Sequence, residues 1–125
     1  MIVRLLVCGE RNFEDREVID EYIVESKATF IINGAAPGAD LLSSQVAQFR
    51  NIPYREFPAN WSWGKRGGPI RNKQMLDEGE PDQVVAFFVD RMKSRGTTNM
   101  VLQANRAGVP VDIFEEGKGW LLARE

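Results

Sequence analysis

The chain has 125 residues, with 16 Lys and Arg against 18 Asp and Glu, a single cysteine (Cys8) and no histidine. The absence of histidine excludes Ser-His-Asp and Cys-His nucleophiles, zinc sites with His ligands and histidine acid/base catalysis, so any catalysis would depend on carboxylates, on Arg or Lys, or on a bound ligand. The net charge of -2 argues against nucleic-acid binding through bulk charge. The unpaired cysteine and the lack of a leader or of a long apolar run predict a cytoplasmic protein with no membrane partner.

The length fits one domain over residues 1–125, with a core to about residue 114 and a tail at 115–125. Residues 1–8 form a near-continuous apolar run that ends at Gly9, which is typical of a buried parallel strand. Apolar spacing and punctuation by Gly and Pro then predict helices at 15–27, 39–50, 69–78 and 96–107, and strands at 29–33, 53–57, 83–89 and 110–114.

Alternating strands and helices predict an α/β domain of three layers, with a mostly parallel five-stranded sheet and helices on both faces. In such sheets, ligands bind outside the carboxyl ends of the strands, near the point where the strand order reverses. The loops after residues 8, 33 and 88 are therefore the candidate site. No metal-ligand pattern is present, and we expect neither a metal nor a cofactor.

The loop from Gly34 to Asp40 joins a strand directly to a helix and contains Gly38. Loops of this kind hold phosphate against a helix N-terminus, but a tight turn that needs glycine explains the sequence equally well. Asp40 is similarly open, since an acid at a helix start also compensates the helix dipole without any ligand.

Two predicted helix starts carry cations where acids are favoured. The helix that opens at Pro69 and the helix that opens at Gly96 have no acid in the first turn, and their basic residues are Lys65, Arg66, Arg71 and Lys73 for the former and Lys93 and Arg95 for the latter. Solvated side chains could explain this pattern at little cost. We favour a bound anion, because both starts belong at the ligand-binding edge of the sheet.

Several other residues near these strand ends are ambiguous. Trp61 and Trp63 would point the same way on an extended strand and could stack on a base, although aromatic residues more often anchor a loop to the core. Arg11 could bind phosphate and Glu10 could accept from ribose hydroxyls, or both could be solvated. Asp90, after the fourth strand, is either a general base or a polar loop residue.

A succession of motifs carries a family resemblance. The motifs are Gly9-x-Arg11-x-Phe13, Asn33-Gly34-Ala-x-x-Gly38-Ala39-Asp40, Gly68-Pro69-Ile70-Arg71-Asn72-x-x-Met75, Pro81-Asp82-x-Val84-Val85-Ala86-Phe87, Gly96-Thr97-x-x-Met100 and Ala107-Gly108-Val109-Pro110-Val111. In order and spacing, to about residue 114, they resemble the YspA-like members of the SLOG superfamily. The resemblance implies a Rossmann-like sheet and binding of a nucleotide or a nucleotide-derived ligand such as one related to ADP-ribose.

The resemblance also implies roles for residues. Gly9, Arg11, Gly34, Gly38 and Asp40 would line the site, Arg71 and Asn72 would approach it from the third helix, and Gly96 and Thr97 would hold phosphate. The superfamily includes LOG-type phosphoribohydrolases, whose catalytic Glu lies three residues after the threonine. Met100 occupies that position here.

The main hypothesis is therefore a sensor or sequestering protein for a nucleotide-type small molecule. A phosphoribohydrolase that uses Glu10, Asp40 or Asp90 is one alternative. Binding of single-stranded nucleic acid, as in DprA-like proteins, is the other and is disfavoured by the acidic net charge. Superfamily members often dimerise, and Trp120, Leu121 and Leu122 in the tail could either cover a homodimer interface or cap the core.

Overall fold

The strands form one sheet in the order β3-β2-β1-β4-β5-β6, in which every neighbouring pair is parallel except β5 and β6. The structure is a computed structural model that describes residues 1–121. The strands are β1 (Arg4–Gly9), β2 (Phe30–Asn33), β3 (Tyr54–Glu56), β4 (Gln83–Phe88), β5 (Val111–Glu115) and β6 (Gly119–Leu121). The α-helices are α1 (Arg16–Ser26), α2 (Ala39–Phe49), α3 (Gly67–Gly79) and α4 (Arg95–Arg106), and a 3-10 helix, η1 (Trp61–Arg66), precedes α3.

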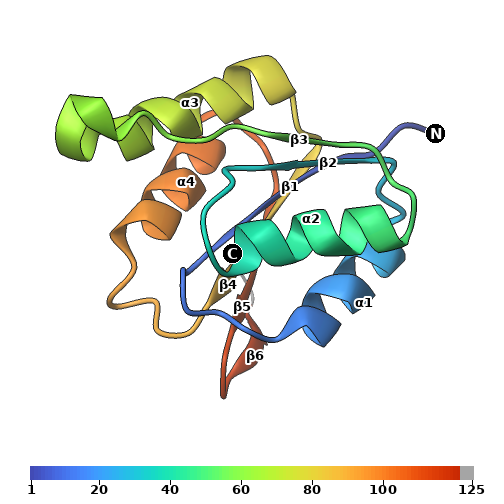
Figure 1. Ribbon diagram of the computed structural model, residues 1–125. Helices are drawn as coiled ribbons and strands as arrows, with labels where there is room; N and C mark the ends of the chain where they lie inside the picture. The colour runs from blue at the N-terminus through green and yellow to red at the C-terminus, as the bar shows by residue number, and fades with distance from the viewer. Residues whose placement is uncertain (122–125) are drawn as a thin grey trace.

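Helices cover both faces of the sheet (Figure 1). This cover is needed because the strands carry apolar side chains on both faces. Successive residues of β1 alternate between the two cores: Leu5 and Val7 pack with α1 and α2, while Leu6 and Cys8 pack on the side of α3 and α4. Both cores are closed, because the central strand residues have almost no exposed surface. The predicted three-layer α/β architecture is confirmed and is consistent with a Rossmann-like fold.

The strand order reverses beside β1. From β1 the chain moves outward through β2 and β3, and it then returns to place β4 against the other side of β1. The chain segments that leave the carboxyl ends of β1 and β4 therefore diverge toward opposite faces of the sheet. This divergence leaves a crevice at the sheet edge where the sequence predicts a ligand.

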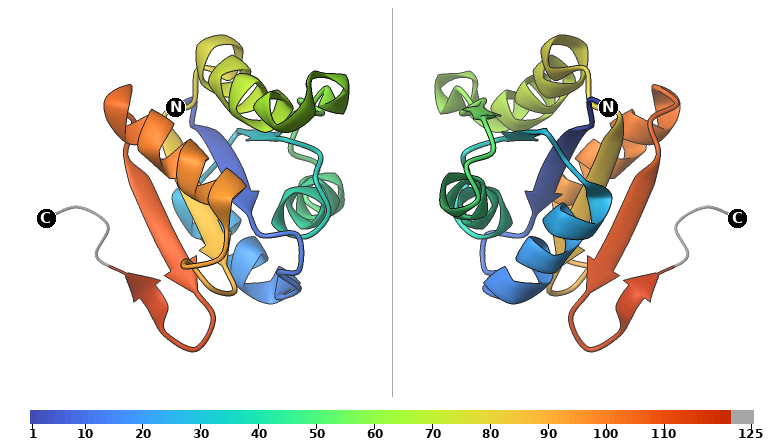
Figure 2. Two further views of the ribbon diagram at one scale, coloured as in Figure 1. Left: turned by 90° about the vertical axis from the view of Figure 1, so that its left-hand side faces the viewer. Right: turned by 90° about the vertical axis from the view of Figure 1, so that its right-hand side faces the viewer.

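Within residues 1–121 the sheet has six strands, so the predicted number of five is wrong. The tail folds back as β6, antiparallel to β5, through a turn in which Gly117 and Gly119 adopt φ angles of +80° and +77°. Figure 2 shows β6 folded back beside β5. Trp120 stacks on Tyr22 of α1 with ring centroids 5.0 Å apart, which anchors the hairpin to the core. Leu121 packs against the opposite core, whereas Leu122 lies outside the described residues.

The segment before α3 also differs from its expected loop conformation. Residues 61–66 form η1, whose start is capped by Asn60, since its side chain accepts a hydrogen bond from the Ser62 amide at 3.1 Å. α3 then begins at Gly67, two residues before Pro69. Trp61 and Trp63 consequently lie on a helix and not on an extended strand, so the expectation that they share one face through strand geometry is wrong.

Across residues 1–121, no helix combines the length and the apolar character needed to cross a bilayer.

Candidate functional site

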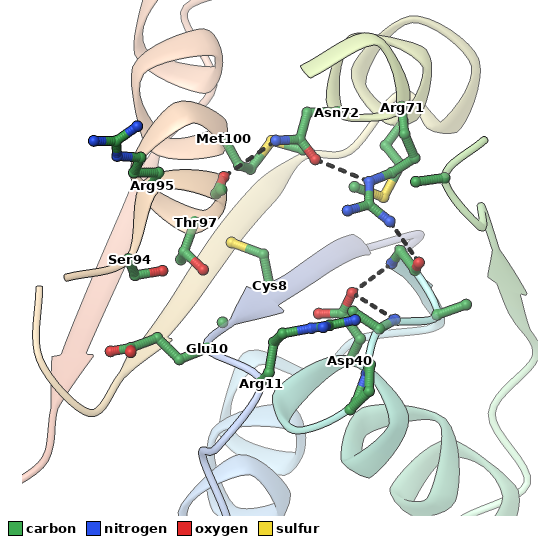
Figure 3. Close-up of a pocket in the computed structure, with 18 of the residues that line it drawn as sticks. Cys8, Glu10, Arg11, Asp40, Arg71, Asn72, Ser94, Arg95, Thr97 and Met100 are labelled. Carbon is green, nitrogen blue, oxygen red and sulfur yellow. Dashed lines mark hydrogen bonds between the residues drawn. The ribbon is translucent and has the colours of Figure 1, made fainter. Parts of the chain in front are cut away.

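A cleft of about 990 Å³ opens at the strand ends where the order reverses (Figure 3). Its walls come from the loop after β1, the loop between β2 and α2, the α3 side of the sheet and the start of α4. Most of the residues predicted from sequence line it, namely Gly9, Glu10, Arg11, Gly34, Asp40, Trp61, Arg71, Asn72, Gly96 and Thr97. The fold thus brings together residues that lie far apart in the sequence.

Three predicted site residues do not line the cleft. Gly38 lies beneath it with φ of +86°, and a Cβ there would come within 2.2 Å of the Glu10 carbonyl oxygen, so glycine is required by the turn and by close packing. Asp90 accepts a hydrogen bond from the Met92 amide at 2.9 Å within its own loop. Trp63 is half-exposed outside the cleft wall that Trp61 helps to form.

Asp40 occupies the start of α2 as an internal anion. Its side chain is 4% exposed, and Oδ2 accepts hydrogen bonds from the amides of Gly34 at 3.0 Å and Ala36 at 3.3 Å. Burial raises the pKa of Asp40 to about 7, against the opposing effects of these amides and of the Arg71 guanidinium. The amides of the loop between β2 and α2 are therefore satisfied by a side chain of the protein itself.

Arg71 and Asn72 form a polar chain between this loop and α4. The Arg71 guanidinium donates through Nη1 to the carbonyl oxygens of Gly34 at 2.5 Å and Phe57 at 3.3 Å, and through Nε to Asn72 Oδ1 at 3.0 Å. Asn72 in turn donates to the Gly96 carbonyl at 3.2 Å. Burial lowers the pKa of Arg71, opposed by the nearby carboxylate of Asp40, and the side chain holds the loop in place as well as lining the cleft.

The start of α4, unlike the start of α2, has no acidic side chain of its own. Its N-cap, Ser94, makes no capping bond with its side chain, and the first turn contains no acid. Within residues 1–121, the backbone amides of Arg95, Gly96 and Thr97 donate to no acceptor. A Cβ built on Gly96 would meet no atom within 4 Å outside its own helix turn, so the side of α4 at Gly96 is open.

Thr97 is the most informative side chain at this helix start. It is only 5% exposed, lines the cleft and points toward the end of β1 where Cys8 lies (Figure 3). Its hydroxyl has no hydrogen-bond partner in the part of the chain that the structure describes. No fully enclosed side-chain oxygen in this part of the chain lacks a partner, so the Thr97 hydroxyl is open to the cleft and available to a ligand atom.

The basic residues at the two helix starts separate in the structure. Lys93 and Arg95 line the cleft beside α4, as the anion hypothesis requires. Lys65 and Arg66 lie outside the cleft wall, and Lys73 pairs with Asp77 on the surface of α3 at 2.8 Å. Of the four basic residues near the start of α3, only Arg71 lines the cleft.

Carboxylates hold the loop that leads from β4 into α4. Glu10 Oε2 accepts from the amides of Val89 and Asp90, both at 2.6 Å, and Glu115 Oε2 accepts from the Arg91 amide at 3.1 Å. With the bond from Met92 to Asp90, four successive amides each donate to a carboxylate oxygen. Glu10 thus has a structural partner in place of the ribose hydroxyl that the sequence suggested.

Sequence reasoning did not assign site roles to several lining residues. Cys8 and Met75 form part of the cleft floor, and burial raises the pKa of the Cys8 thiol. Ser94 lies at the α4 start, where a serine before Gly-Thr-Thr was an available N-cap signal. In residues 1–121, no group of three or more Cys, Asp or Glu side chains is arranged to hold a metal ion.

A comparison with protein families identifies the chain. Residues 3–64, which include β1, α2 and the loop around Asp40, match the model of the YspA, cpYpsA-related SLOG family. The chain belongs to this SLOG family. Membership is compatible with binding of a nucleotide-related ligand. No curated protein sequence gives a significant match.

Proposed function

We propose that this SLOG protein binds a nucleotide or nucleotide-derived ligand, such as one related to ADP-ribose, and holds the ligand's phosphate at the start of α4. The unsatisfied helix start carries the proposal: three free amides, the partnerless hydroxyl of Thr97 and no acid in the first turn. Helix N-termini bind anions through such amides and through the helix dipole, and Lys93 and Arg95 add positive charge at the same wall. A role as sensor or sequestering protein follows from binding without hydrolysis.

The carboxylates of the cleft are less well suited to cleaving a glycosidic bond. Met100, at the position of the hydrolase glutamate, lines the cleft and is 1% exposed. Glu10 and Asp40 are each fixed by two backbone amides through one oxygen, and Asp90 lies outside the cleft wall. This arrangement supports binding over phosphoribohydrolase chemistry, which needs a carboxylate free to stabilise charge or to activate water.

The aromatic residues give little support to single-strand binding. Stacking of successive bases uses several aromatic side chains along one groove. Here Trp61 lines the cleft and Trp63 does not, because the 3-10 helix separates them.

Thr97→Val tests the proposal, because valine keeps the shape of threonine and removes a hydroxyl that has no protein partner. Calorimetry with adenosine monophosphate and with ADP-ribose should show binding to the wild type, and a loss of about 1.5–3 kcal/mol in the variant for a ligand that the wild type binds. Thr98→Val is the matched control, since Thr98 is exposed and does not line the cleft. Equal affinity of both variants and the wild type contradicts the assignment of the phosphate to α4.

A further inference from the structure

Two side chains face the cleft from opposite sides of β1. Asp40 lies at the start of α2, which follows β2, and Thr97 lies at the start of α4, which follows β4. Both strands pair with β1, so their ends are two strand spacings apart, roughly 10 Å. Figure 3 shows Asp40 and Thr97 on either side of Cys8. Both residues line the same cleft.

The Asp40 carboxylate keeps one oxygen for a ligand. Oδ2 is occupied by the amides of Gly34 and Ala36, whereas Oδ1 has no hydrogen-bond partner in residues 1–121. No enclosed side-chain oxygen in this part of the chain lacks a partner, so Oδ1 must retain contact with the solvent of the cleft. Above pH 7 the ionised form of Asp40 predominates, and an ionised carboxylate accepts hydrogen bonds and donates none, so the matching ligand group is a donor.

The polar groups on the two sides of the cleft match two different chemical groups of a ligand. The free amides of α4, with Lys93 and Arg95, are donors and match the acceptor oxygens of a phosphate. Asp40 offers an acceptor on the other side of β1, where a ligand must present a donor. Glu10, the acceptor that the sequence suggested for this task, holds the amides of Val89 and Asp90 and lies on the other side of Cys8 from Asp40 (Figure 3).

We propose that Oδ1 of Asp40 accepts a hydrogen bond from a sugar hydroxyl of the ligand whose phosphate lies at the start of α4. This inference rests on the proposed function, because it takes the phosphate position from it. The sugar is chosen over the base because it is the donor-bearing group joined directly to the phosphate. Asp40 is therefore a residue that selects phosphorylated sugars over simple phosphate esters.

The first test needs no variant. Ribose 5-phosphate and methyl phosphate are both phosphate monoesters, and they differ in the hydroxyls that Asp40 would recognise. In NMR titrations of the wild type at pH 8, where Asp40 is mostly ionised, ribose 5-phosphate should bind at least tenfold more tightly. Equal affinities would overturn the role of Asp40 and leave the phosphate site standing, whereas failure of both probes to bind would remove the proposed function and this inference with it.

The second test changes the acceptor. In Asp40→Asn, the amide oxygen can still accept from Gly34 and Ala36 while an NH2 group replaces Oδ1, so the preference for ribose 5-phosphate over methyl phosphate should fall below about threefold. The affinity for methyl phosphate itself should not fall, because the substitution removes a negative charge from the cleft. Asp15→Asn is the matched control, because Asp15 also caps a helix, accepting from the Val18 amide at 3.2 Å, and does not line the cleft. A preference that survives in Asp40→Asn contradicts the proposal.

Discussion

The starts of α2 and α4 lie at the same edge of the sheet and have opposite chemistry. Both follow a parallel strand and a short loop, residues 34–38 before α2 and residues 89–94 before α4, and both contribute residues to the cleft wall. At α2 the protein supplies its own anion, Asp40, which closes the loop through Gly34 and Ala36. At α4 the first turn has no acid, and the amides and the Thr97 hydroxyl have no partner in residues 1–121.

The contrast shows that a glycine-rich loop before a helix does not identify a phosphate site. What matters is whether the positive end of the helix dipole is already neutralised. An internal carboxylate makes the α2 start complete without ligand, and its absence leaves the α4 start dependent on an external anion. Adding an acid at the start of α4 should therefore weaken anion binding there, and changing Asp40 or its neighbours should affect the stability of the loop before α2.

Gly96→Asp should have the largest effect, because it gives α4 an internal acid like that of α2. The new Cβ meets no atom within 4 Å, so the fold should be retained, and an acid in the first turn should stabilise it by about 0.3–1 kcal/mol. Like-charge contact with a bound phosphate costs several kcal/mol, so the affinity for adenosine monophosphate should fall by more than about a hundredfold. Asn105→Asp, with the same change in net charge on an exposed residue near the other end of α4, should bind nearly as the wild type does. Calorimetry and thermal unfolding measure both effects, and retained affinity in Gly96→Asp would contradict the comparison.

Asp40 should make the stability of the fold depend on pH. Its pKa is about 7 in the folded chain and 3.8 as the ordinary value, in an environment shared with Arg71, Glu56 and Cys8. Between these two values the folded state holds one proton more than the unfolded state, so the free energy of unfolding contributed by Asp40 decreases as pH rises, by about 1.4 kcal/mol per pH unit. Urea unfolding of the wild type and of Asp40→Asn from pH 4 to pH 8 should show a difference that changes with this slope and levels off above pH 7. A constant difference would mean that Asp40 is ionised throughout.

Arg71→Ala should destabilise the closed loop near α2. The variant loses the partly buried bonds to the Gly34 and Phe57 carbonyls, a cost of about 1–3 kcal/mol in the free energy of unfolding. Arg55→Ala is the control, because Arg55 pairs with Glu78 on the surface, where such a pair contributes about 0–1 kcal/mol. Denaturant unfolding compares the two, and equal stability of both variants would show that Arg71 does not hold the loop.

Much of the fold could be predicted from the sequence because its signals are local. The apolar run before Gly9 and the periodic apolar residues of α1, α2 and α4 give elements whose bounds agree with the structure to within a few residues. η1 and β6 were not predicted, since a Trp-Ser-Trp-Gly segment has no clear period and a three-residue strand has too few residues to show one. Asn60 as a cap and the glycines at 117 and 119 as a hairpin turn were the available signals.

The sequence predicted where the site lies. It did not predict which hydrogen bonds its residues make. Parallel topology brings the strand ends together, which is why ten of the thirteen predicted site residues, counting Trp61, line one cleft. The partner of Glu10 could not be predicted, because its amides lie 79 and 80 residues away in sequence. Nor does any sequence pattern reveal that the Thr97 hydroxyl is left without a partner while Arg71 is held by carbonyl oxygens.

The four successive amides from Val89 to Met92, each bonded to a carboxylate oxygen, should lower the conformational entropy that is lost when a ligand binds. The backbone before α4 is already ordered by Glu10, Glu115 and Asp90, so binding need not freeze a moving loop. Ordering of loops and side chains is a main part of the entropy lost on association. A preorganised entrance to α4 should therefore let even a small phosphate ester bind with little change in conformation, and let association proceed without waiting for the loop to close.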